Sequence, residues 1–254
     1  MRAREESEPS MVETPAADAI FADPRLAQLY DVFDGPRNDL ASYLDIATEL
    51  RARSILDIGC GTGSFAVLAA SQGFAVTAVD PAAASLAIAR TKPHADRVTW
   101  QHGGVDSAPA GPVDLAVMTG NVAQVFLTDR SWADVLQQVR TRLTPGGHLV
   151  FETRRTSDRA WERWSEDSDE ATIPVPGIGA VHHWRQILSV ELPLVSFRHS
   201  YRFPGGDVLE SDSTLRFRTD VENRASLADA GFAVVDVRDA ADRPGAEFVY
   251  IARS

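Results

Sequence analysis

Short apolar runs, separated by segments of helical periodicity, organise most of the chain. Four of these runs have the length and the β-branched content of buried strands: residues 54–58, 75–80, 98–102 and 113–118. A further helix, with Ser131 as its N-cap, is predicted over residues 132–143, ahead of a fifth strand that ends at Glu152. Strands that alternate with helices in this way predict an α/β fold, with a mostly parallel sheet and helices on both faces.

A polar stretch and two amphipathic segments precede the first strand. Residues 1–20 are rich in charge and predict a disordered N-terminal tail. Helices are expected over residues 25–33 and 39–50, the second with Asn38 as its N-cap. Two helices in this place suit a lid over the end of the sheet.

From Ala180 onward the pattern changes to alternation of apolar and polar positions, which is typical of antiparallel strands. Three such strands are expected: residues 180–189, 195–203 and 208–217. Because successive side chains of a strand point to opposite faces, His182 and Trp184 share one face and His183 lies on the other. These strands predict a small antiparallel β cap inserted after the fifth strand.

A helix over residues 220–230 and two strands, over 232–237 and 247–252, complete the pattern. Gly231 stands where a helix often ends in a left-handed residue. The chain is therefore divided into four parts: a tail (1–20), a core with lid helices (21–154), the cap (155–217) and the end of the core sheet (218–254).

The first strand runs directly into three glycines at alternate positions, Gly59, Gly61 and Gly63. Glycine allows positive φ there and lets a ligand lie against the main chain. A dinucleotide-binding turn has the spacing G-x-G-x-x-G, which fails because position 64 is serine, and the Gly-Lys-Ser/Thr of a P-loop is absent. The turn therefore indicates a ligand without a pyrophosphate.

Together with Asp57, this turn resembles motif I, D/E-x-G-x-G-x-G, of the class I methyltransferases that depend on S-adenosylmethionine (SAM). The L-x-P-G-G turn at residues 143–147 and the closing strands extend the resemblance over residues 54–154 and 216–253. It implies a Rossmann-like seven-stranded sheet, mostly parallel with an antiparallel last strand. It also implies SAM as cofactor, S-adenosylhomocysteine as product, and the methionine part of SAM over the turn that includes Cys60.

The resemblance implies further contacts with SAM. Asp80 ends the second strand, where a carboxylate accepts both ribose hydroxyls, although Asp before Pro81 also suits a helix start. Tyr30 of the lid is expected near the SAM carboxylate, with half-buried packing as the alternative. Val105 and Asp106, after the third strand, are expected at the adenine, with a surface turn as the alternative for Asp106. Thr119 and Asn121, after the fourth strand, are the other expected contacts, with a solvated loop as the alternative for Asn121.

The acceptor site depends on less specific positions. In similar methyltransferases an inserted cap forms the substrate pocket, so the aromatic and histidine face of the cap is the first choice for acceptor contacts. The expected substrate-binding residues are Gln124, Trp184, His199 and Tyr201. His182, His183 and Glu152 are candidates for a general base, unranked among themselves, and packing within the cap is the alternative for the histidines.

Charge and composition limit which binding partners, which location and which metals can be expected. The net charge of −11 comes without a basic stripe, which argues against nucleic acid and against an anionic membrane surface. No apolar stretch approaches the roughly 20 residues that cross a bilayer. Cys60 is the only cysteine, so no intrachain disulfide is expected and a cytoplasmic location is predicted. The histidines lack a carboxylate constellation, and no metal is expected.

These observations predict a transferase that moves a methyl group from SAM to a nitrogen, oxygen or carbon nucleophile of a small-molecule acceptor. The sulfonium makes the methyl carbon electrophilic, so the protein mainly aligns the nucleophile for in-line displacement. A non-catalytic SAM-binding regulatory module is one alternative. An NAD-dependent oxidoreductase is another, against which the glycine spacing argues. A homodimer is left open.

Overall fold

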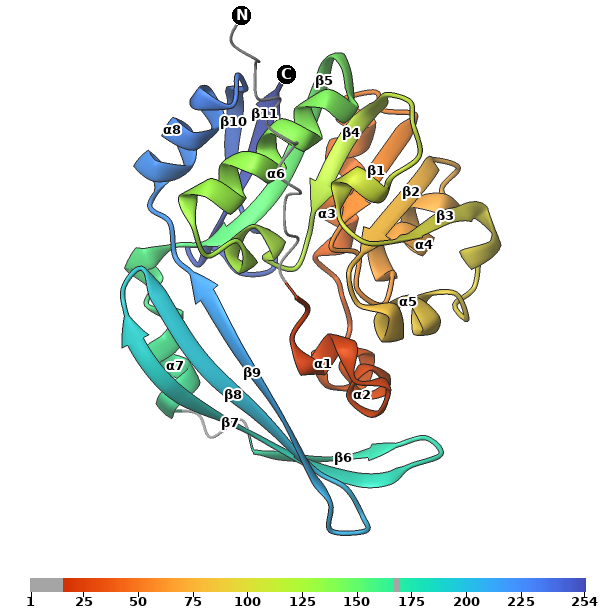
Figure 1. Cartoon of the computed structure of the whole chain (residues 1–254), viewed down its shortest axis with the longest axis vertical. Helices are drawn as coiled ribbons and strands as arrows, with labels where there is room; N and C mark the ends of the chain where they lie inside the picture. Colours follow the sequence, from red (N-terminus) through yellow and green to blue (C-terminus); the bar gives the residue numbers. More distant parts are fainter. Residues whose placement is uncertain (1–15, 167–169) are drawn as a thin grey trace, which may run out of the picture.

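The chain forms two separate β-sheets, one in the core and the other in a cap (Figure 1). The structure is a computed structural model that describes residues 16–166 and 170–254. Most of the expected N-terminal tail lies outside these residues. The last two residues of the range expected as tail belong to α1 (Ala19–Ala22), because Ile20 is buried against the cap.

The core sheet has seven strands in the order β3-β2-β1-β4-β5-β11-β10. Their bounds are β1 Ser54–Ile58, β2 Ala75–Asp80, β3 Val98–His102, β4 Val113–Met118, β5 Leu143–Arg154, β10 Ala233–Asp239 and β11 Glu247–Arg253. The first five strands are parallel, and β11 is antiparallel to both β5 and β10. The predicted Rossmann-like sheet with an antiparallel last strand is confirmed. Its parallel strands are apolar on both faces because helices cover both.

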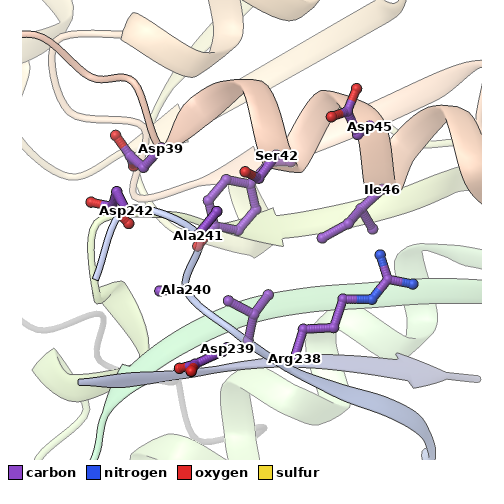
Figure 2. A pocket seen from close by; sticks show the side chains of 11 residues that line it. Asp39, Ser42, Asp45, Ile46, Arg238, Asp239, Ala240, Ala241 and Asp242 are labelled. Carbon is purple, nitrogen blue, oxygen red and sulfur yellow. The ribbon is translucent and has the colours of Figure 1, made fainter. Parts of the chain in front are cut away.

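The helices α3 (Leu40–Glu49) and α4 (Ser64–Ser71) cover one face of the sheet. Tyr43 and Phe65 pack there with their rings 6.3 Å apart. At the edge of this face a pocket of about 240 Å³ opens between α3 and the loop that joins β10 to β11 (Figure 2). Four of the eleven residues that line it are aspartates, and its one arginine, Arg238, is paired with Glu49 at 2.7 Å. None of the predicted site residues lines this pocket.

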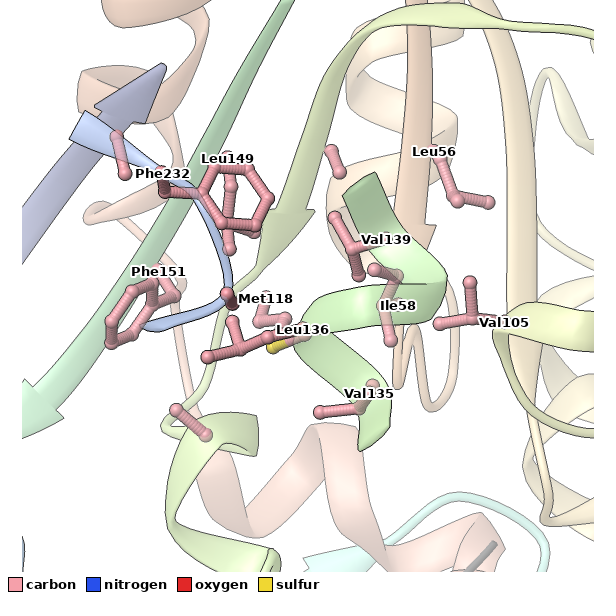
Figure 3. Packing of buried hydrophobic residues seen from close by; sticks show 14 of the residues in the cluster. Leu56, Ile58, Val105, Met118, Val135, Leu136, Val139, Leu149, Phe151 and Phe232 are labelled. Atoms are coloured by element: carbon pink, nitrogen blue, oxygen red, sulfur yellow. The ribbon is translucent and has the colours of Figure 1, made fainter. Parts of the chain in front are cut away.

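The opposite face is covered by α6 (Asp129–Arg142) and α8 (Asp220–Asp229). Figure 3 shows Val135, Leu136 and Val139 of α6 beside Ile58 and Met118 of the sheet. The helix begins three residues before the predicted start, and its N-cap is Thr128 rather than Ser131. The two side chains form a capping box in which the Thr128 hydroxyl accepts the Ser131 backbone N–H at 3.0 Å.

The remaining helices are short or belong to the lid. Their bounds are α2 Pro24–Asp34, α5 Ala83–Ala89 and α7 Ala160–Glu166, with single 3₁₀ turns at Ala95–Arg97, Val105–Ser107, Val122–Val125 and Thr156–Asp158. The expected cap of α3 by Asn38 is wrong. The N-cap residue is Asp39, whose carboxylate accepts two hydrogen bonds from Arg37 at 2.9 and 2.7 Å instead of bonding the helix.

The cap is a four-stranded antiparallel sheet in the order β6-β7-β8-β9. Its strands are β6 Ala171–Val175, β7 Gly179–Glu191, β8 Leu194–Arg202 and β9 Val208–Arg216. The strand β6 was not expected; it carries Pro174, which an edge strand tolerates because one side of its backbone is unpaired. One face of the cap packs on α1 and α2, which therefore lie between the cap and the core (Figure 1).

Arg218 joins the cap to the core where β9 leads into α8. Only 3% of this residue is exposed. Its guanidinium donates hydrogen bonds to the carbonyls of Ala123 (3.3 Å), Phe126 (2.6 Å) and Thr128 (3.2 Å), and it lies 5.3 Å from the ring centre of Trp132. Burial lowers its pKa to about 10. One buried cation thus satisfies three carbonyls of the segment between β4 and α6.

Replacing Arg218 with methionine should lower the free energy of unfolding by about 2–4 kcal/mol, because the buried carbonyls of Ala123 and Phe126 lose their donor. Denaturant unfolding measures this difference. Arg224→Met is the matched control, because Arg224 is exposed on α8 and bonds only Asp220; its loss should cost less than about 1 kcal/mol. Equal losses in the two variants would contradict this account of the junction.

Candidate active site

The three glycines of the turn after β1 serve two purposes. All have positive φ: 66° at Gly59, 53° at Gly61 and 78° at Gly63. A Cβ at Gly59 would lie 2.7 Å from Val122, and one at Gly63 would lie 2.5 Å from Trp100, so these two glycines permit packing. A Cβ at Gly61 would meet no atom within 4 Å. Gly61 is therefore the glycine whose bare main chain faces open space.

Asp80 lies beside this turn at the end of β2. Its Oδ2 accepts the N–H of Gly61 at 2.7 Å and its Oδ1 accepts the N–H of Ala82 at 2.7 Å. The residue is 6% exposed, and burial raises its pKa. The helix after it begins at Ala83 rather than at Pro81, and Asp80 is not its N-cap. Each carboxylate oxygen keeps a lone pair for a ligand hydroxyl.

Asp57 is buried under the turn without any hydrogen-bond partner among the described residues. It is 1% exposed, and neither carboxylate oxygen is bonded. Burial, and then the charge of Asp80, raise its pKa to about 7. A buried carboxylate without donors costs free energy, so this position is explained better by a ligand than by the stability of the fold.

Glu152 holds the loop that follows β4. Its Oε1 accepts the backbone N–H groups of Gly120 at 2.7 Å and Asn121 at 3.0 Å. The Asn121 amide donates in turn to Glu247 Oε1 at 3.1 Å. Burial, followed by the charge of Glu247, raises the Glu152 pKa to about 7. Glu152 therefore supports this loop, where Thr119 follows β4, and its part as a general base stays a prediction.

The lid supplies a residue that the sequence did not indicate, Arg37. Its guanidinium pairs with Asp39 at 2.7 Å, and it reaches within 4.0 Å of the position that a Cβ on Gly120 would take. The charge of Arg37 lowers the pKa of both Asp57 and Glu152 against the larger effect of burial. This cation therefore lies over the same strand ends as the two acids.

Tyr30 lies half-buried on α2, its ring 5.2 Å from that of Phe21. Burial raises its pKa, and the charges that act on it include Asp34, Arg37 and Arg154.

The two expected adenine contacts differ in burial: Val105 is buried in the core, whereas Asp106 is exposed. Their contact with an adenine stays a prediction.

The inner face of the cap brings two expected histidines together. His183 of β7 and His199 of β8 lie with Nε2 and Nδ1 2.8 Å apart. Tyr201 pairs with His183 across the strands, with ring centres 4.7 Å apart, and Phe33 of α2 packs on both. Burial lowers the pKa of His183 to about 4 and that of His199 to about 3. Both imidazoles are therefore neutral at pH 7.

Three expected site residues are placed elsewhere. His182 and Trp184 face away from α2, because strand alternation puts them opposite His183; His182 lies 2.8 Å from Glu170 on that outer side. Gln124 is 1% exposed and uses both ends of its amide inside the protein, accepting from Arg154 and donating to the carbonyl of Arg216. The structure therefore does not bring these three residues together with the inner face of the cap, and their part in catalysis or acceptor binding stays a prediction.

A seven-stranded sheet in this order, with a glycine turn and an acid at neighbouring strand ends, defines a Rossmann-like methyltransferase. The sequence matches the family described as a methyltransferase domain over residues 25–207. This match covers more than half of the chain, and the protein belongs to that family. The predicted class I methyltransferase is confirmed, with SAM as the cofactor of the class.

Curated relatives match over shorter stretches. A Geobacillus sp. (strain WCH70) protein described as a methyltransferase is 54% identical over 108 residues, which are 41% of this chain and 44% of that protein. The ubiquinone/menaquinone biosynthesis C-methyltransferase UbiE of Rubrivivax gelatinosus is 28% identical over 109 residues, 42% of each chain. The chain thus spans less than half the length of these relatives.

Solved structures extend the likeness over most of the chain. A SAM-dependent methyltransferase from Clostridium acetobutylicum aligns with a TM-score of 0.73 and 15% identity, covering 90% of this chain and 97% of that one. The sugar N-methyltransferase KedS8 from a Streptoalloteichus species aligns with a TM-score of 0.70 and 17% identity, covering 99% and 100%. At these identities the likeness shows the fold.

The described residues also bear on membranes and metals. Within residues 16–166 and 170–254 no helix is long and apolar enough to cross a bilayer. In the same part of the chain, no three histidine, cysteine or carboxylate side chains are grouped as ligands of a metal ion.

The buried carboxylate of Asp57 predicts a pH-dependent stability. Because its pKa is about 7 in the native state, the protonated form supports folding below about pH 4. That contribution is lost as the pH rises through 7. The unfolding free energy of the wild type should therefore fall between pH 5 and pH 8, whereas that of Asp57→Asn lacks this loss. The difference between the two proteins should shift by about 2–3 kcal/mol in favour of Asp57→Asn over this range.

Denaturant unfolding of both proteins at several pH values measures the difference. Asp134→Asn, on the surface of α6, is the control and should follow the wild type at every pH. Parallel curves for Asp57→Asn and the wild type would show that Asp57 does not titrate in this range.

Proposed function

We propose that this protein transfers the methyl group of SAM to a nitrogen, oxygen or carbon nucleophile of a small-molecule acceptor held between α2 and the cap. The observation that supports it most is the open main chain at Gly61 directly beside the Asp80 carboxylate. A thioether tail fits against bare backbone, and a carboxylate with free lone pairs accepts the hydroxyls of a ribose.

The residues around this turn suit the rest of the cofactor. Arg37 and Tyr30 provide donors over the strand ends, and a carboxylate group of the ligand would complement them. Asp57 and the Glu152–Asn121 loop place acceptors on the other side, where an ammonium group would find partners. When bound, SAM supplies an electrophilic methyl group on a sulfonium; the chain binds, orients and excludes water.

The acceptor side is formed by α2 and the inner face of the cap. The ring of Phe33 on α2 packs against that of Tyr201 with centres 5.4 Å apart, and the Tyr201 hydroxyl has no hydrogen-bond partner within the described residues. The neutral pair His183–His199 adds a donor and an acceptor there. A small polar molecule without a strong charge suits these groups. Two proteins of similar structure, a sugar N-methyltransferase and an amino pentose methyltransferase, support an acceptor of this size.

The geometry argues against binding of a dinucleotide. In such proteins a pyrophosphate sits at the N-terminus of the helix after the first strand. Here the first residues of α4 adjoin the carboxylate of Asp31, which accepts the hydroxyl of Thr62 at 2.5 Å. A pyrophosphate at this helix end would have to displace the ion pair between Asp31 and Lys92, whose ammonium also donates to Ser64 Oγ at 3.0 Å.

Turnover tests the proposal against a non-catalytic SAM-binding module. The protein is incubated with SAM and a library of small amines, amino sugars and phenols, and S-adenosylhomocysteine is measured by chromatography. Acceptor-dependent product supports a methyltransferase. Binding of SAM by calorimetry without product from any acceptor class supports the binding module, and absence of SAM binding rejects both.

Gly61→Ala tests the cofactor position. The new Cβ would project into the space over the turn, so SAM affinity should fall about tenfold or more. Gly73→Ala is the matched control: Gly73 also has positive φ, 94°, and open space, but it precedes β2 at the other end of the sheet. Both variants should lose about 1–2 kcal/mol of stability from backbone strain. Calorimetric titration with SAM should separate them, and equal affinities would reject this position.

Strand alternation offers a second pair of variants. Tyr201→Phe and His199→Phe remove polar groups from the inner face of the cap, whereas His182→Phe removes one from the outer face. Once an acceptor is known, kcat/KM for it should fall about tenfold in the inner variants and stay within about twofold in the outer one. An outer variant as impaired as the inner ones would place the acceptor elsewhere.

A further inference from the structure

Lys92, the only lysine of the chain, holds three segments together beside the glycine turn. It stands between α5 and the following 3₁₀ turn. Its Nζ lies 2.6 Å from Asp31 Oδ2 of α2, and it donates to Thr62 Oγ1 at 3.2 Å and to Ser64 Oγ at 3.0 Å. All three donors of the ammonium therefore have an oxygen partner.

The hydrogen bonds of this cluster are mutually consistent. The Thr62 hydroxyl donates its proton to Asp31 Oδ1 at 2.5 Å, which leaves its lone pairs to accept from Lys92. Thr62 is 3% exposed and the Lys92 side chain 18%, whereas the Asp31 side chain is 37% exposed, so water reaches the ion pair only from the side of Asp31. We call the four residues Asp31, Thr62, Ser64 and Lys92 the lid latch.

Position 92 holds a lysine rather than an arginine, and the geometry of the three oxygen partners accounts for this. All other fixed cations among the side chains are arginines. A cation beside the first residue of α4 is also unfavourable, because a helix N-terminus carries partial positive charge. A compact ammonium points its donors in three tetrahedral directions, whereas a guanidinium donates within one plane. The arrangement of three oxygens around Nζ therefore requires lysine and the compensating charge of Asp31.

The lid latch acts on the lid through a residue next to Tyr30. Asp31 is its only member on α2, and it fixes the rotation and height of that helix over the glycine turn. A second bond, from the Ser85 hydroxyl to the carbonyl of Phe21 at 2.9 Å, ties α1 to α5 on the same side. Loss of the Lys92 charge would leave the Asp31 carboxylate without its ion-pair partner.

We propose that Lys92 is a positioning residue for the cofactor: through Asp31 it keeps α2 closed on the glycine turn, so that Tyr30 retains SAM. This inference rests on the proposed function, because it takes SAM as the ligand of the turn. Lys92 touches neither the acceptor region nor the open face of Gly61. Its removal therefore changes how long the cofactor stays bound and leaves the rate of methyl transfer at saturating SAM unchanged.

Three variants test the proposal. Lys92→Met removes the ammonium and keeps the alkyl chain, and Lys92→Arg keeps the charge but changes the donor directions. Arg25→Met is the matched control, because Arg25 also sits on α2 but pairs with Asp207 of the cap at 3.2 Å, away from the turn. Dissociation of radiolabelled SAM, chased with unlabelled SAM, is measured for each, together with turnover at saturating SAM.

We expect Lys92→Met to release SAM about tenfold faster and Lys92→Arg several-fold faster, with turnover at saturating SAM within about twofold. Arg25→Met should release SAM at the wild-type rate. A wild-type release rate in Lys92→Met overturns the proposal, as does an equal acceleration in Arg25→Met. A loss of turnover at saturating SAM would also overturn it, since it would indicate a part in the chemistry.

Hydrogen exchange separates failure of the lid latch from failure of the proposed function. Without any ligand, amides of α2 should exchange faster in Lys92→Met than in the wild type, while those of α6 should not change. Unchanged exchange in α2 overturns the lid latch whatever the ligand is. Faster exchange in a protein whose wild type does not bind SAM rejects the proposed function and the part of this inference that concerns SAM.

Discussion

The hydrogen bond from the Gly61 amide to the Asp80 carboxylate is the contact on which the candidate site depends. It joins the turn after β1 to the tip of β2, two strands that are parallel neighbours in the sheet. The bond requires the main chain to pass through the left-handed region at Gly61, where no side chain shields the backbone. The same contact thus creates the bare surface and fixes an acid beside it.

Much of this arrangement could be predicted from the sequence because its signals are local. Buried parallel strands appear as apolar runs, and the ends of neighbouring strands meet at one edge of the sheet. The glycine turn and Asp80 therefore lie side by side, as the strand pattern predicts. Strand alternation likewise separated His182 from His183 correctly, although it did not tell which face would meet α2. That depends on packing between the cap and the lid.

Contacts between distant segments carried no such signal. Lys92 and Asp31 lie 2.6 Å apart but far apart along the chain, and neither stands in a recognisable motif. Arg37 follows a Gly-Pro turn that suggested only the end of a helix. The strand β6 was missed because Pro174 argues against a strand unless its edge position is known. In each case the missing information is the tertiary neighbour, which local propensity does not contain.

The acids at the strand ends explain why the site is built at a cost to stability. Asp57 has no donor, and Glu152 lies beside the buried Glu247, whose Oε2 also lacks a partner in the described part of the chain. Selection for folding alone would favour apolar or amide side chains there. Burial makes such groups costly in the free protein, and the same burial strengthens their attraction to a positive ligand. Under the proposed function, the ammonium and sulfonium of SAM would offset this penalty on binding. Occupancy of the turn would then stabilise the core through the same acids.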